Sequence, residues 1–214
     1  EGGFLVKDRE ETTYLLREWH EGRECDVREL SEVEEAVRAL AFLHRNFQTT
    51  PEKETEKFRE ESLETELRRK NAELRRVRKF IRSRRRKTEF EQEFLNHFER
   101  FYEEAEKALE EAGSGKIRAL FERSLTEGIL CHGDYNQHHV LLSREGTALT
   151  DFGHCHFGVR TGDLARFFRK ILEKQNWDKV YGNAMLREYG RVRPLSEEER
   201  EDFRVRLSYP EKFW

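Results

Sequence analysis

The sequence predicts an α+β fold that is mostly helical, with a β-hairpin in the middle of the chain and a short β segment at the N-terminus. Two patterns support this class. Apolar residues recur at helical spacing over most of the chain, and short apolar runs joined by turns lie before residue 22 and at 140–152. A chain of 214 residues is long enough to bury one large core or two small ones.

The composition excludes several classes of protein. Charged residues make up 40%, but 16 Phe, 6 Tyr and 3 Trp can seed a core, which argues against disorder. No run of about 18 apolar residues exists, so we expect no membrane partner. Cys25, Cys131 and Cys155 give no disulfide framework, which favours a reducing cytoplasm. The lack of an initiating Met, with Met185 the only Met, suggests a fragment of a longer protein.

The N-terminal part predicts strands and then a helix. FLV, the polar KDREE and TTYLLREW predict two strands and a turn within 4–22. Ser31 starts the helix, with Glu34 three residues on to complete a capping box. The helix runs to about Phe47, and its predicted buried face consists of Val33, Val37, Leu40, Ala41 and His44.

Residues 52–112 predict two or three long charged helices. Within them, residues 68–87 carry a net charge of +11, which leaves −14 on the remaining chain. Such a block can bind nucleic acid or another anionic surface. Leu67, Leu74, Val77 and Ile81 recur at helical spacing, so a solvated helix paired with Glu-rich flanks is favoured and a nucleic-acid partner is not expected. A second apolar stripe at helical spacing is predicted to be buried in the core. It consists of Phe90, Phe94, Phe98, Phe101, Tyr102, Ala105 and Leu109.

The segment 131–156 carries most of the candidate chemistry. It contains five of the eight His residues, with Asp134 before the predicted hairpin Val140–Phe152 and Asp151 at its end. Two nearby carboxylates suit a divalent cation and a hydroxyl to be deprotonated. The cluster around Cys155 also allows a zinc site, but neighbours in a strand point to opposite faces, so a core role for the cysteines is favoured. Later, Leu164, Phe167, Phe168, Ile171 and Leu172 predict a helix, and Ser196 with Glu199 caps a last one.

The motif His132-Gly133-Asp134 is followed by the hairpin and then by Asp151-Phe152-Gly153. This order of motifs resembles the catalytic core of aminoglycoside and choline kinase-like phosphotransferases, whose loop reads H-G-D-x-x-x-x-N. The resemblance implies that Asp134 receives a substrate hydroxyl proton, that His132 shapes the catalytic loop and that Asp151 holds a metal ion. His139 stands at the Asn position and becomes the second implied metal ligand. The implied cofactor is ATP with Mg²⁺ or Mn²⁺, and the acceptor is an unidentified hydroxyl.

The likeness narrows to the spore coat kinase-like (CotS) branch through LCHGDYNQHHVLL, RPLSEEE and SYPEKFW. It implies the C-terminal lobe of a protein kinase-like fold over 23–214, with 52–112 as its charged helical region and 1–22 as the hinge and the end of an N-terminal lobe. Trp19 and His20 fall where the family's hinge meets adenine, with ordinary linker packing as an equal alternative. Asp163 would open the next helix and steady the catalytic loop.

Two departures from the family leave two functional hypotheses open. Imidazole at position 139 suits Mn²⁺ or Zn²⁺ better than Mg²⁺. The chain also shows no Gly-rich phosphate loop and no V-A-I-K-like Lys. The first hypothesis is an ATP-dependent phosphotransferase in the cytoplasm. The alternative is a catalytically degenerate, kinase-fold component of the spore coat, with other coat proteins as partners.

Overall fold

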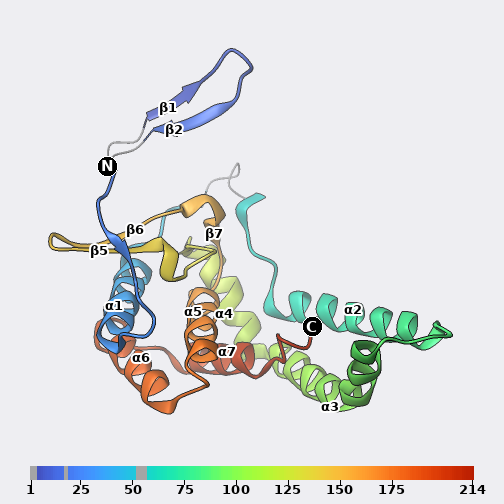
Figure 1. Ribbon diagram of the computed structural model, residues 1–214. Helices are drawn as coiled ribbons and strands as arrows, with labels where there is room; N and C mark the ends of the chain where they lie inside the picture. The colour runs from blue at the N-terminus through green and yellow to red at the C-terminus, as the bar shows by residue number, and fades with distance from the viewer. Residues whose placement is uncertain (1–3, 17–18, 52–56) are drawn as a thin grey trace.

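The computed structural model describes residues 4–16, 19–51 and 57–214 and shows a mostly helical body with small β-sheets (Figure 1). The strands are β1 (Phe4–Lys7), β2 (Thr13–Leu16), β3 (Arg23–Glu24), β4 (Leu130–Cys131), β5 (Val140–Ser143), β6 (Gly146–Leu149) and β7 (His156–Phe157). The helices are α1 (Leu30–Asn46), α2 (Leu63–Ser83), α3 (Glu89–Ala112), α4 (Gly115–Thr126), α5 (Thr161–Lys174), α6 (Lys179–Val192) and α7 (Glu197–Ser208). The predicted α+β class is confirmed. Within these ranges no helix is both long and apolar enough to cross a bilayer.

Strands β1 and β2 form an antiparallel hairpin that stands apart from the helical body (Figure 1). The Asp8 carboxylate stabilises the turn by accepting two backbone N–H hydrogen bonds from within it. Leu5 and Leu15, which face each other in the register, are 75% and 61% exposed. Both predicted strands are confirmed, although Arg17 and Glu18 lie outside the described residues. The division of the chain at residue 22 stays a prediction.

The first core packs α1 against α5 and α6. The predicted face of α1 is buried, and so is the predicted stripe of α5. Tyr135 joins this core from the segment that follows β4, and its hydroxyl donates to the backbone oxygen of Ala36 over 2.7 Å. The functional segment is therefore anchored directly to α1.

The start of α1 differs from the prediction. The helix begins at Leu30, and the expected Ser31–Glu34 capping box is wrong. Glu32 stabilises this end instead, because its carboxylate accepts the backbone N–H of Asp26 over 2.9 Å and pairs with Arg23 of β3. A carboxylate in the first turn also favours the positive end of the helix dipole. The ion pair ties α1 to β3 and fixes the start of the helix.

The second core lies between α2, α3, α4 and α7. Leu67, Leu74 and Ile81 of α2 are buried, whereas Val77 is 44% exposed. The aromatic stripe of α3 is confirmed from Phe94 onward, but the prediction for Phe90 is wrong because it is 77% exposed. Phe90 lies in the first turn of α3, at the tip of the α2–α3 hairpin, which no other helix covers (Figure 1).

Ion pairs cover much of the polar face of α2. Arg68 pairs with Glu64, and Arg78 pairs with Glu99 of α3. Lys70 reaches Glu211 near the C-terminus over 2.7 Å. The expected pairing of the basic stretch with acidic flanks is therefore present, and it orients α2 on α3 and on the C-terminal segment.

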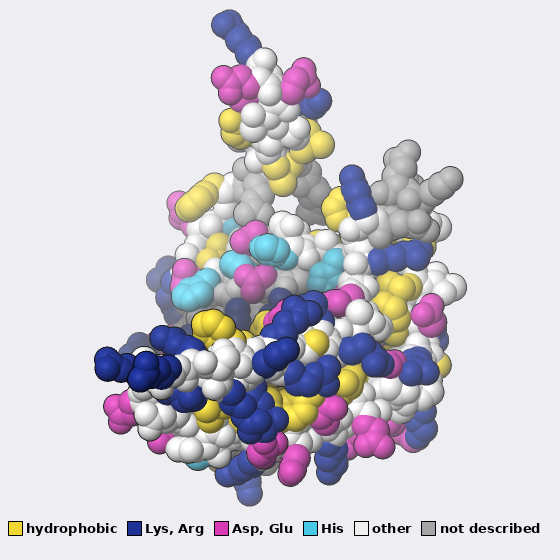
Figure 2. Space-filling model, turned by 90° about the vertical axis from the view of Figure 1, so that its right-hand side faces the viewer, with side chains coloured by type: hydrophobic (Ala, Val, Ile, Leu, Met, Phe, Trp, Pro, Cys, Tyr) yellow, Lys and Arg dark blue, Asp and Glu magenta, His cyan; other side chains and the backbone are white. Residues whose placement is uncertain are grey.

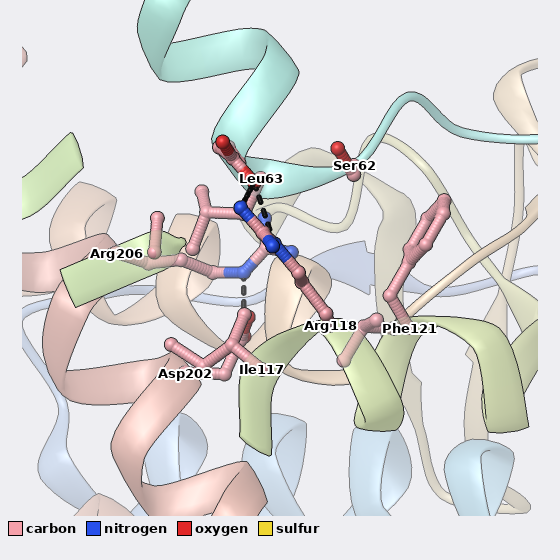
Figure 3. Close-up of a pocket in the computed structure, with 10 residues that line it drawn as sticks. Ser62, Leu63, Ile117, Arg118, Phe121, Asp202 and Arg206 are labelled. Atoms are coloured by element: carbon pink, nitrogen blue, oxygen red, sulfur yellow. Dashed lines mark hydrogen bonds and ion pairs between the residues drawn. The ribbon is translucent and has the colours of Figure 1, made fainter. Parts of the chain in front are cut away.

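A small pocket marks the junction of α2, α4 and α7, where Arg206 points toward Asp202 (Figure 3). The Arg206 Nε atom donates to the Asp202 carboxylate over 2.7 Å, and the same carboxylate accepts the hydroxyl of Thr161. Thr161 is the first residue of α5. Helix α7 therefore stabilises the start of α5, and the predicted Ser196–Glu199 capping box of α7 is confirmed.

The predicted hairpin is present as β5 and β6, with Val140 opposite Leu149. Its second strand ends at Leu149 and not at Phe152, because Phe152 begins a short 3₁₀ turn. Strand β3 adds to the outer edge of β5, and β4 pairs with β7. These two small sheets place residues 132–139 and 151–154 beside each other.

The two α3 phenylalanines differ enough to test the second core. We expect Phe98→Ala to lower the free energy of unfolding by about 3–5 kcal/mol, because the fully buried ring would leave a cavity. The matched variant Phe90→Ala should change it by less than about 0.5 kcal/mol. Denaturant unfolding monitored by circular dichroism measures both, and equal losses would contradict this packing.

Candidate active site

A buried carboxylate holds the loop His132–Asp134. One oxygen of Asp163 accepts the backbone N–H of His132 over 2.6 Å, and the other accepts that of Gly133 over 2.9 Å. Gly133 has φ +86°, and a Cβ there would lie 2.0 Å from the backbone oxygen of His154. Only glycine fits this position without displacing the neighbouring turn. The loop therefore has one defined conformation.

Asp163 is held in turn from α1 and α6. The His44 Nε2 atom lies 3.4 Å from its carboxylate, and His44 Nδ1 lies 2.8 Å from the Tyr189 hydroxyl. Burial alone would raise the pKa of Asp163, but the hydrogen bonds from His44 and the two loop amides outweigh it and lower that pKa. Burial lowers the pKa of His44, so the ring is neutral. The predicted core role of His44 is present, with Asp163 as its partner.

One face of α5 carries three residues that contact the loop. Arg166 follows Asp163 by one helical turn and donates to the backbone oxygen of Gly133. Lys170, one turn further, places Nζ 3.3 Å from Oδ1 of Asp134. The sequence interpretation missed Arg166 and Lys170. Their spacing of three and seven residues from Asp163, on the same helical face, is the signal that could have found them.

The structure places Asp134 at the end of this loop, with its carboxylate one-third exposed. Partial burial would raise its pKa, but the Lys170 ammonium and His139 outweigh that effect, so the pKa of Asp134 is lowered. The carboxylate is thus ionised at neutral pH. It can accept a hydrogen bond from an acceptor hydroxyl and orient it, which suits a loose phosphoryl-transfer transition state better than a strong base would.

His132 connects the loop to the end of β6. Its ring is buried, and Nε2 lies 2.9 Å from the backbone oxygen of Thr150. The ring also packs against Phe152, with 4.6 Å between centroids. Burial lowers the pKa of His132, so the ring is neutral. The contacts fit the expected loop-shaping role, and a direct part in catalysis stays a prediction.

His139 lies between the two aspartates. Its Nε2 atom is 3.3 Å from Oδ2 of Asp151, and Nδ1 is 3.9 Å from Oδ2 of Asp134. Figure 2 shows His and acidic side chains gathered on this face, above a ridge of basic ones. The three predicted residues are therefore brought together, although the sequence separates Asp151 from His139 by a whole hairpin.

The pair His139–Asp151 fits a divalent cation. The His139 Nδ1 atom lies 2.9 Å from the backbone oxygen of Asp134 and 3.1 Å from the amide nitrogen of Asn136, and Nε2 faces Asp151. In the tautomer with its proton on Nδ1, the Nε2 lone pair is available to a cation. Two ligands with metal bonds of about 2.1 Å and angles near 90–109° are about 3.0–3.4 Å apart, which matches the 3.3 Å observed. No group of three or more His, Cys, Asp or Glu side chains with metal-site geometry occurs within residues 4–16, 19–51 and 57–214. The remaining ligands would come from water and phosphates, as is usual for Mg²⁺.

The backbone at Asp151 is strained. Its φ is 59° and its ψ is 64°, in the left-handed region that non-glycine residues seldom adopt. The side chain accepts the backbone N–H of Gly153 over 3.4 Å, which helps to hold that conformation. Strained residues of this kind cluster at functional sites. This one directs the Asp151 carboxylate toward His139.

The two residues predicted to contact adenine, Trp19 and His20, are exposed and are not grouped with the aspartates as His139 is. Trp19 is 86% exposed, and His20 is exposed beside it. Among the described residues, neither side chain has a contact to Asp134 or Asp151. Cys131 is buried and free, as expected of a core cysteine, and Cys155 is free and half-buried. A nucleotide role for Trp19 and His20 stays a prediction.

Comparison with known proteins identifies the family. The model of the phosphotransferase enzyme family matches residues 3–195, so the chain belongs to that family. A solved aminoglycoside phosphotransferase from Alicyclobacillus acidocaldarius is similar in fold, with a TM-score of 0.83 and 20% identity. The match covers all of this chain and 65% of that one. No curated protein sequence matches significantly. The expected phosphotransferase resemblance and kinase-like fold are confirmed.

The neutral histidines make stability depend on pH. Below about pH 6.5 the unfolded chain binds protons at His44 and His132 that the folded chain does not, so stability falls as the pH falls. We expect His44→Gln to make the fall between about pH 7 and 5 shallower by up to about 1.4 kcal/mol per pH unit. Urea unfolding across this range measures the slopes. Equal slopes in both proteins would contradict the neutral state of His44.

Proposed function

We propose that the protein transfers the γ-phosphoryl group of ATP to a hydroxyl of an acceptor. The observation that carries this proposal is the grouping of Asp134, His139 and Asp151, in which Asp134 ends the loop held by Asp163 and Asp151 reaches His139 from the far end of the hairpin. Family membership supports phosphotransfer in general, and this grouping supplies a proton acceptor and a cation site at the same place. Trp19 and His20 are the proposed contacts for the nucleotide base.

The steps follow from the charges around the loop. The hydroxyl oxygen of the acceptor bonds to the γ-phosphorus, and Asp134 accepts the proton of that hydroxyl. The bond from the γ-phosphorus to the bridging oxygen breaks, which releases ADP. Lys170 lies beside Asp134, where its ammonium can offset negative charge that develops during transfer. A divalent cation held by Asp151 and His139 would neutralise phosphate charge. His132, Arg166 and Asp163 fix the loop that carries Asp134.

We place the acceptor in a groove beside Lys170. A cavity of about 260 Å³ lies between α2, α5 and the C-terminal segment. Lys170 and Arg166 of α5 line it, and so do Lys70 and Glu66 of α2. The lining carries charges of both signs, so polar groups of the acceptor would be recognised there. Lys170 lines this cavity and also lies 3.3 Å from Oδ1 of Asp134, so an acceptor bound there would have the carboxylate on the other side of the Lys170 ammonium.

A second function is favoured by one residue. His139 replaces the amide side chain of the family's loop, and loss of a proper metal ligand is a route by which a kinase fold becomes a scaffold. In that case the protein is a CotS-type structural component, made in the mother-cell cytoplasm and deposited on the spore coat. The two functions differ in whether ATP with Mg²⁺ or Mn²⁺ stabilises the fold.

Removal of the Asp134 carboxylate tests the catalytic assignment. We expect Asp134→Ala to reduce ATP turnover by the full-length protein by about 10²–10⁴-fold, because the acceptor loses its proton acceptor. Glu145→Ala, which removes an exposed carboxylate in the β5–β6 turn, is the matched control and should have no effect. The measurement is ADP release with each metal. Unchanged turnover in Asp134→Ala would refute the assignment.

Position 139 should determine the metal preference. Imidazole favours Mn²⁺ over Mg²⁺ more strongly than an amide does, so we expect His139→Asn to shift the ratio of Mg²⁺- to Mn²⁺-supported turnover toward Mg²⁺ by at least about tenfold. Titration of each metal in the same ADP assay gives the ratio. A ratio that does not change would show that His139 is not a ligand. Inactivity and lack of ATP binding in both proteins would favour the scaffold function.

A further inference from the structure

The tip of the α2–α3 hairpin, residues 76–90, concentrates positive charge that is only partly paired with carboxylates. Residues 76–90 contain eight Lys and Arg side chains and one acidic residue, Glu89. Three of the eight pair with carboxylates, namely Arg78 and Arg82 with Glu99 and Arg84 with Glu91. Within the described part of the chain, no carboxylate partner is found for the other five, which are Arg76, Lys79, Arg85, Arg86 and Lys87.

Apolar side chains stand among these cations. Phe80 is 62% exposed and Phe90 is 77% exposed, and Val77 between the basic residues is 44% exposed. Arg76, Lys79 and Phe80 share the face of α2 that lies opposite the buried Leu74 and Ile81. Figure 2, which faces the hairpin, shows Lys and Arg side chains over this region with hydrophobic ones between them.

The tip is preformed. The Arg84 guanidinium lies 5.9 Å from the centre of the Phe80 ring and pairs with Glu91 over 2.5 Å, which connects the end of α2 to the start of α3. Thr88 and Glu91 form a capping box at the start of α3. The side chains are therefore displayed on a rigid turn that projects from the body (Figure 1), and binding a partner would cost little ordering.

We propose that this tip binds the surface of an anionic lipid bilayer. The cations match acidic headgroups, and the two phenyl rings match the boundary between headgroups and acyl chains, where amphipathic protein surfaces insert their apolar side chains. A nucleic-acid duplex offers phosphates to the cations but no apolar medium to the rings. The net charge of −14 outside residues 68–87 repels an anionic surface and orients the tip toward it. Such a peripheral contact needs no membrane-spanning helix, and none is found within residues 4–16, 19–51 and 57–214.

The test is co-sedimentation of the 214-residue chain with vesicles of phosphatidylcholine alone or with about 30% phosphatidylserine. We expect at least about tenfold stronger binding to the anionic vesicles in about 0.1 M salt, and a severalfold loss in about 0.5 M salt. The double variant Arg85→Glu/Arg86→Glu should lose at least about tenfold of that binding. Arg45→Glu/Arg144→Glu makes the same charge change at exposed sites away from the tip and should bind as the wild type does.

Removal of the phenyl rings of Phe80 and Phe90 distinguishes binding to a bilayer from binding to other polyanions. Phe80→Ser/Phe90→Ser should weaken vesicle binding severalfold, and both positions are exposed enough for the fold to persist. Equal binding to neutral and anionic vesicles would overturn the proposal, as would full binding by either tip variant. Displacement of the protein from vesicles by an equal phosphate concentration of duplex DNA or RNA would also overturn it and assign the tip to nucleic acid.

Discussion

The loop His132–Asp134 depends on one buried carboxylate. Asp163 has both oxygens occupied by the backbone N–H groups of His132 and Gly133, so the loop cannot move without leaving a buried charge unpaired. A neutral side chain could not replace it, because an amide would set its NH₂ group against an N–H donor. The cost of burying the charge is offset by these charge-assisted hydrogen bonds and by His44. The rest of the site is built around this constraint.

Four helices contribute to the position of the Asp163 carboxylate. Helix α5 carries Asp163 itself, α1 supplies His44, and α6 supplies the Tyr189 hydroxyl that fixes the ring. Helix α7 holds the start of α5 through Asp202 and Thr161. The second core is thereby coupled, through α5, to the loop His132–Asp134. A substitution in α7 can therefore alter the geometry of Asp134 without contacting it.

Local patterns predicted much of the fold and part of the site. The buried apolar stripes of α1 and α5 and the helix cap at Ser196 could be predicted from the sequence, because each depends on residues only a few positions away. The H-G-D and D-F-G motifs pointed to Asp134 and Asp151 through a family resemblance, and the structure brings both close to His139, while their roles stay predictions.

The remaining features depend on distant parts of the chain. The start of α1 is set by an ion pair from Glu32 to Arg23 in a strand, which competes with the Ser31 cap. Phe90 is exposed because its stripe extends past the helices that cover it. The contact of Lys170 with Asp134 needs the fold to bring α5 to the loop.

The most direct test of the account concerns the space between His139 and Asp151. Crystals grown with Mn²⁺ and a non-hydrolysable ATP analogue would give the metal position from its anomalous scattering. We predict a peak within about 2.3 Å of both His139 Nε2 and Asp151 Oδ2, in contact with the nucleotide phosphates. An ordered nucleotide with no metal at this position, and with direct contact between His139 Nε2 and Asp151 Oδ2 unchanged, would contradict this prediction.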